Sequence, residues 1–176
     1  MDLLLISHNT DRSSDAYRTI INTLKIDHRK YLAAMIQDCP RATSETEREL
    51  ASNFLAIKTE LGTESHNNRH HPTKLTTIIN LDKCRVASKH RIRNRQAAGL
   101  MVYVTLKRNE RPSTNQLILL TNIYIRPRAS YAETANLLSD IIARSAGKMS
   151  RLVIAGDLDA SAPGRDPSHV EIDRKA

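Results

Sequence analysis

The chain has few aromatic residues and few cysteines, and each shortage excludes a class of protein. It contains five tyrosines, one phenylalanine and no tryptophan, so its core must be mainly aliphatic. Cys39 and Cys84 match no zinc-ligand spacing and offer no disulfide framework, which predicts two free thiols in a reducing compartment. No apolar run approaches the ~20 residues of a membrane span. We therefore expect a soluble, intracellular protein.

The length of 176 residues predicts one domain that can bury a proper core, and an apolar content of 40% is compatible with one. We expect residues 1–168 to form this domain. Prolines, glycines and mixed charges follow Ala162, which predicts that residues 169–176 are a disordered tail.

Periodicity predicts the order β-α-β-α, then mostly strands, then α-β. One helix is expected from Ser13 or Ser14 to about Lys25, and a second from Thr43 or Ser44 to about Leu61. The remaining predicted elements are strands at 2–7, 31–37, 75–81, 98–107, 116–125 and 151–155, and a helix at 131–146. The middle strands are too closely spaced for helical crossovers, so the sequence predicts an α/β fold with mixed strand directions.

Residues 151–160, Arg-Leu-Val-Ile-Ala-Gly-Asp-Leu-Asp-Ala, read as an apolar strand that ends in two acids. Alternate residues of a strand face the same side, so Asp157 and Asp159 can converge, with backbones about 7 Å apart. Without a cation these carboxylates repel by roughly 3 kcal/mol at ~5 Å and a dielectric of ~20, so their convergence suggests a bound cation. A strand ending in a solvated Asp turn is an equally good interpretation of this decapeptide alone.

Other apolar runs end in polar groups in the same way. Residues 3–9 end at Asn9, and residues 33–38 end at Asp38. Residues 117–127 read LILLTNIYIRP, with Tyr124 three residues before the proline. We expect Asn9, Asp38, Tyr124 and Asp157 to converge at one end of the sheets, because each ends an apolar strand.

The order of these motifs resembles the endonuclease/exonuclease/phosphatase superfamily. It is most similar to the apurinic-type endonuclease domain that non-LTR retrotransposons carry ahead of their reverse transcriptase. In that family the motifs read roughly strand-x-Asn, Gln-Glu, Tyr-x-Pro-Pro and Gly-Asp-Phe-Asn-Ala. The resemblance implies a four-layered α-β-β-α sandwich and Mg²⁺- or Mn²⁺-dependent hydrolysis of phosphodiesters in DNA.

The resemblance also implies a role for each residue at the strand ends. Asp38 would hold the metal with Asn9 beside it, Asp157 would orient or deprotonate the water, and Tyr124 would donate to the phosphate. Asp159 stands where the family has an Asn that donates to that phosphate, and an ionised carboxylate cannot donate.

Two further departures from the family concern the metal ligand and the end of the domain. Asp38 replaces a Glu and is one methylene shorter. The family's last strand and its terminal Asp-His pair would lie beyond Ala176, so the resemblance predicts a domain without its last third. Such a domain would have an unpaired sheet edge and weak or no activity.

The positive charge is concentrated in the middle of the chain. Between Arg69 and Arg95 there are eight Lys or Arg residues against one acid, and the formal net charge of the whole chain is +8. In an extended conformation the side chains that share one face are Lys89, Arg91, Arg93 and Arg95. This row can follow the phosphates of duplex DNA, although a solvated basic loop explains it equally well.

Two functions are therefore compatible with the sequence. The first is a Mg²⁺-dependent nicking module of a retrotransposon polyprotein, nuclear when active and followed by a reverse transcriptase. The second is a catalytically inactive relic that only binds nucleic acid through residues 69–95.

Overall fold

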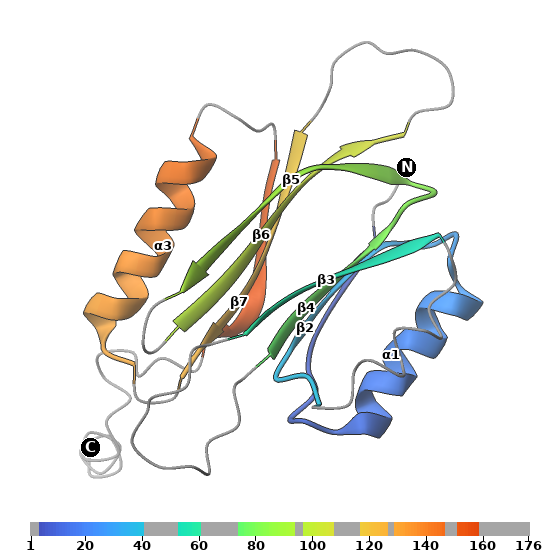
Figure 1. Ribbon diagram of the computed structural model, residues 1–176, viewed down its shortest axis with the longest axis horizontal. Coiled ribbons are helices and arrows are strands. Elements are labelled where there is room, and N and C mark those ends of the chain that lie inside the picture. Colours follow the sequence, from blue (N-terminus) through green and yellow to red (C-terminus); the bar gives the residue numbers. More distant parts are fainter. Residues whose placement is uncertain are drawn as a thin grey trace, which may run out of the picture.

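The computed structural model describes residues 4–40, 53–60, 74–93, 97–107, 117–126, 129–146 and 151–158. Over these residues, two four-stranded sheets pack face to face between two helices (Figure 1). The arrangement is a four-layered α-β-β-α sandwich.

The first sheet contains the amino-terminal strands and is covered by α1. Its strand order is β1 (Leu4–Asn9), β2 (Tyr31–Gln37), β4 (Lys74–Asn80) and β3 (Phe54–Glu60). The edge strand β1 is parallel to β2, and α1 (Ser14–Ile26) connects these two strands. The other pairs in this sheet are antiparallel.

The second sheet contains the later strands and is covered by α3. Its strand order is β5 (Cys84–Arg93), β6 (Ala97–Leu106), β7 (Leu117–Ile125) and β8 (Arg151–Leu158). The edge strand β8 is parallel to β7, and α3 (Tyr131–Ser145) connects them. The remaining neighbours are antiparallel, so the predicted mixture of strand directions is confirmed.

Both helices begin at a serine that accepts a hydrogen bond from the first turn. The Ser13 side chain accepts from the backbone N–H of Ala16, and Ser130 forms a reciprocal capping box with Glu133. The face of α1 that packs on the first sheet consists of Tyr17, Ile20, Ile21 and Leu24.

The core between the sheets is aliphatic, as the shortage of aromatic residues predicts. Its buried members are Leu32, Ala33, Met35, Ile57, Ile79, Cys84, Leu100, Val102, Val104, Ile118 and Leu120. Separate clusters lie under α1 and under α3, so each sheet is covered on both faces.

Two strands differ from the prediction: β3 replaces the end of a predicted helix, and β5 was not predicted. Residues 54–60 form β3 rather than the end of a helix running to Leu61, because they pair along their whole length with β4. The beginning of that predicted helix lies outside the described residues. The basic segment at 84–93 is the strand β5 rather than a loop, and it pairs with β6. In the described part of the chain, no helix has the length and apolar character needed to cross a membrane.

Candidate active site

The carboxyl ends of the two parallel strand pairs bring the predicted residues together. Asn9 at the end of β1 is the register partner of Gln37 on β2, and Asp38 follows directly. On the other sheet, Tyr124 of β7 is the register partner of Asp157 of β8. Each sheet therefore supplies two of the predicted residues.

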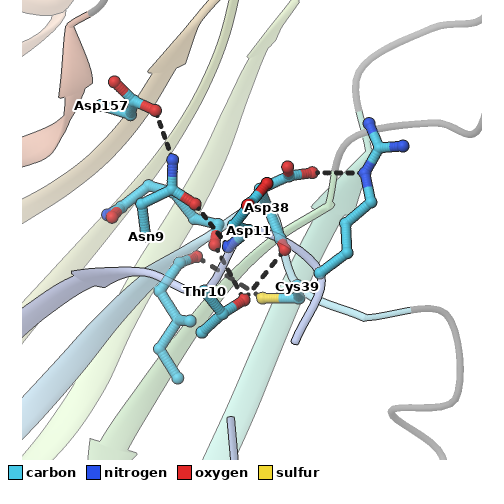
Figure 2. Close-up of polar contacts among 9 residues, drawn as sticks. Asn9, Thr10, Asp11, Asp38, Cys39 and Asp157 are labelled. Carbon is cyan, nitrogen blue, oxygen red and sulfur yellow. Dashed lines mark hydrogen bonds and ion pairs between the residues drawn. The ribbon is translucent and has the colours of Figure 1, made fainter. Parts of the chain in front are cut away.

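A hydrogen bond between Asn9 and Asp157 joins the two sheets at this point. The Asn9 Nδ2 donates to Oδ2 of Asp157, although 148 residues separate them in sequence. The Asn9 Oδ1 accepts the backbone N–H of Asp11 at 2.8 Å, which orients the amide with its nitrogen toward the carboxylate (Figure 2). Asn9 is exposed and Asp157 is partly buried, so solvent reaches this contact.

Asp38 is held by the turn that follows β1. Its backbone carbonyl accepts from Thr10 Oγ1 at 2.9 Å and from the backbone N–H of Arg12 at 2.8 Å. Its carboxylate Oδ1 accepts from Arg12 Nε at 3.1 Å. The side chain of Asp38 is only 10% exposed, and that of Arg12 is 48% exposed.

The backbone around this site is strained. Asp11, Arg12 and Asp38 have φ angles of 45°, 59° and 47°, in the left-handed region that side chains disfavour. Each such residue costs on the order of 1 kcal/mol or more, and conformations of this kind persist where the surrounding structure fixes them. The strain lies in the two segments that carry Asn9 and Asp38.

Tyr124 lies near the carboxyl end of β7. Its ring is partly buried and packs against Leu75 of β4 and Ala98 of β6. Because its register partner is Asp157, the backbone of Tyr124 lies beside the backbone of that residue.

A buried amide network beneath the site was not predicted from the sequence. Gln37 Nε2 donates to Oδ1 of Asn122 at 2.7 Å, across the two sheets. Asn122 Nδ2 lies within hydrogen-bond distance of the carbonyls of Ile36 at 3.2 Å and Thr76 at 3.1 Å. Gln37 and Asn122 are 1% and 0% exposed. The available signal was an amide in the middle of the apolar strand LILLTNIYI.

The cysteine next to the site is a structural residue. Cys39 Sγ donates to Thr76 Oγ1 at 3.2 Å, and burial raises the pKa of its thiol to about 11. Burial also raises the pKa of Cys84 to about 11. Both thiols are therefore protonated at neutral pH and are poor nucleophiles and metal ligands.

Two of the remaining predicted residues, Lys89 and Arg91, lie away from this site. Lys89 and Arg91 are exposed on β5, at the opposite edge of the sheet from β8, and Arg91 Nε donates to the Lys58 carbonyl of β3 at 3.1 Å. The strand β5 also includes Arg93, whose side chain is not among those described. Asp159 and Arg95 lie outside the described residues.

The donor groups suit a small, hard cation. Mg²⁺ takes one or two carboxylates and keeps several waters, so it needs few protein ligands. Asp38 and Asp157 offer carboxylate oxygens, whereas the amide oxygen of Asn9 already accepts the N–H of Asp11 and its nitrogen faces Asp157. Among the described residues, no three His, Cys, Asp or Glu side chains gather as a metal-binding group. Arg12 engages one oxygen of Asp38.

Comparison with known proteins identifies the fold. No family model and no curated protein matches the sequence. Similar solved structures include D. rerio TDP2 humanised by 14 mutations, with a TM-score of 0.61 at 13% identity over 89% of this chain and 62% of that one. An endonuclease/exonuclease/phosphatase family protein from Bacteroides thetaiotaomicron matches with a TM-score of 0.62 at 14% identity, over 89% and 63%.

The human Nocturnin catalytic domain is similar too, with a TM-score of 0.59 at 12% identity, over 81% of this chain and 57% of that domain. These likenesses show the fold: the chain shares an α/β sandwich with these three structures, one of which is an endonuclease/exonuclease/phosphatase family protein. The chain spans about 60% of the length of these structures.

Proposed function

We propose that this domain hydrolyses phosphodiester bonds in DNA with Mg²⁺ or Mn²⁺, as a nicking endonuclease of the non-LTR retrotransposon kind. The observation that carries the proposal is the hydrogen bond from Asn9 to Asp157, which joins the carboxyl ends of β1 and β8 next to Asp38. It joins an amide and a carboxylate from distant parts of the chain, and Asp38 follows directly after Gln37, the register partner of Asn9.

Phosphodiester hydrolysis needs a base for water, positive charge on the phosphate and a donor to its oxygens. Asp157 is the proposed base, because Asn9 binds its Oδ2 and thereby fixes the orientation of its other oxygen. Asp38 would hold the divalent cation, which neutralises charge on the phosphate. Tyr124, fixed beside Asp157 on β7, is the proposed hydroxyl donor.

The structural neighbours support a nucleic-acid substrate. One of them is D. rerio TDP2 complexed with a single-strand DNA product, with a TM-score of 0.61. The fold also occurs in a Bacteroides thetaiotaomicron mannosyl-6-phosphatase, so the fold alone does not select DNA. The basic composition of the chain favours DNA over a small phosphate ester.

The second candidate is a catalytically inactive domain that binds duplex DNA through its backbone phosphates. The exposed positions of Lys89 and Arg91 on the edge strand β5 favour it, because they are remote from Asp157 and can bind DNA without cleavage. Arg93 and Arg95 are proposed to extend this row. For the active nuclease we propose a nuclear location, with a reverse transcriptase following in the polyprotein.

Nicking of supercoiled plasmid in the presence of Mg²⁺ tests the first candidate. We expect slow nicking by the unaltered chain, because Asp159 stands where a donor is needed and loss of one such donor costs roughly 10²–10³ in rate. Asp159→Asn should raise the rate and Asp157→Ala should abolish it. Asp140→Ala removes an exposed carboxylate of α3 and should change nothing. Rapid cleavage that survives Asp157→Ala would contradict the proposal.

A further inference from the structure

Asp38, the proposed metal ligand, already has a cationic partner within the chain. Arg12 Nε donates to its Oδ1 at 3.1 Å, and this carboxylate is almost buried. Carboxylate oxygens are the ligands that Mg²⁺ and Mn²⁺ require, so a bound metal and this guanidinium would share the same group.

The backbone holds this ion pair in place. The N–H of Arg12 donates to the carbonyl of Asp38, and the hydroxyl of Thr10 donates to the same carbonyl. Both members of the pair, Arg12 and Asp38, adopt left-handed backbone angles. Asp11, which directly precedes Arg12, does so too. A chance surface ion pair would not need three residues in a disfavoured conformation.

We infer that Arg12 competes with the divalent cation for Asp38 and so sets the metal concentration that the site requires. The side chain of Arg12 is 48% exposed, so it can turn into solvent when a metal takes its place on Asp38. While the guanidinium stays, it occupies Oδ1 and repels a second cation. The inference rests on the proposed function, because it takes Asp38 as the metal ligand.

Binding of Mn²⁺ alone, measured from the loss of the free-ion signal in electron paramagnetic resonance, tests this without any need for activity. We expect Arg12→Gln to bind Mn²⁺ at least tenfold more tightly than the unaltered chain. Arg12→Lys, which keeps the charge, should bind within about threefold of the unaltered chain.

Arg18→Gln is the matched control for charge. Arg18 is exposed on α1, its ion pair with Asp15 spans 4.0 Å, and its loss changes the net charge equally. We expect less than a twofold change in Mn²⁺ affinity for this variant. Thermal unfolding of each variant checks that the fold is intact.

Asp38→Asn decides where the metal binds. It should abolish Mn²⁺ binding both alone and combined with Arg12→Gln. If the unaltered chain binds Mn²⁺ through Asp38 and Arg12→Gln binds no more tightly, the competition is overturned while the proposed metal site stands. If Mn²⁺ binding survives Asp38→Asn, or no variant binds Mn²⁺, the metal role of Asp38 is overturned together with the inference.

Discussion

Gly156 directly precedes Asp157, and its lack of a Cβ atom allows the strand to place the Asp157 carboxylate where it lies. It is the register partner of Ile123 on β7. A Cβ at Gly156 would overlap the backbone of Ile123, lying 2.7 Å from its carbonyl carbon. The glycine therefore allows β8 to approach β7 closely, immediately before the strand presents Asp157.

Replacing Gly156 with Ala should destabilise the domain by roughly 2–3 kcal/mol, because a backbone atom cannot move aside as a side chain can. Gly99→Ala is the control, since a Cβ there would meet Ile92 and Leu137 at an ordinary 3.7 Å. It should be neutral or stabilise by about 0.5 kcal/mol, because alanine loses less backbone entropy on folding. Urea unfolding measures both. Equal stability of the two variants would contradict the close approach.

The conformations of individual residues at the site could be predicted only in part. The ends of the apolar strands predicted that Asn9, Asp38, Tyr124 and Asp157 converge. In the structure Asn9 contacts Asp157, and Asp38 follows the register partner of Asn9. The pairing of Arg12 with Asp38 was not predicted, because it depends on left-handed backbone angles that neighbouring residues do not specify. A single sequence gives no signal for such a turn unless a glycine marks it.

Among the elements, β5 combines a structural and a charged face. Its pairing with β6 shifts register between Val86 and Ser88, and beyond this bulge His90 stacks edge-on against Tyr103 while Ile92 is buried under α3. Lys89 and Arg91 alternate with them and are exposed. The strand thus presents its cations away from α3.

Replacing Lys89 and Arg91 together with Ala should weaken binding to duplex DNA about equally for all sequences. Each lost phosphate contact should flatten the slope of log affinity against log salt by about 0.9, so the pair should flatten it by about 2. Fluorescence anisotropy at several salt concentrations measures the slope. Lys25 and Arg29, at the end of α1 and just after it, are a control pair of equal charge. An unchanged slope for the β5 variant would show that its cations are merely solvated.

The elements themselves were largely predictable, and the two errors share a cause. Strands such as Tyr31–Gln37 are continuous apolar runs. The helices α1 and α3 each have a capping serine and a clear apolar face. Residues 54–60 and 84–93 carry polar and basic side chains because each forms an outer strand of its sheet. Their strand structure comes from pairing with β4 and β6, which local pattern does not reveal.

At the scale of the whole molecule, the buried amides Gln37 and Asn122 fix one sheet relative to the other. Asn122 of the second sheet reaches backbone carbonyls of both β2 and β4 in the first. The network lies one residue from Asp38 and two from Tyr124 along the chain. It therefore sets the alignment in which the halves of the site meet.

Truncating Asn122 to Ala should cost roughly 2–4 kcal/mol of stability, because two buried carbonyls lose its amide group and Gln37 Nε2 keeps only its bond to the Met35 carbonyl. Asn136→Ala, at an exposed position of α3, should change stability by less than about 0.5 kcal/mol. Unfolding in urea followed by circular dichroism compares them. A fully stable Asn122→Ala protein would show that hydrophobic packing alone aligns the sheets.

The distance in sequence between Asn9 and Asp157 has a consequence for protein synthesis. A ribosome releases the amino-terminal half first, so Asn9 and Asp38 emerge long before β8. Until residues 151–158 have been translated and paired with β7, Asn9 of the first sheet cannot form its hydrogen bond to Asp157. A nascent chain interrupted before β8 therefore cannot carry the complete site, and the proposed activity can arise only after the last described strand has been made.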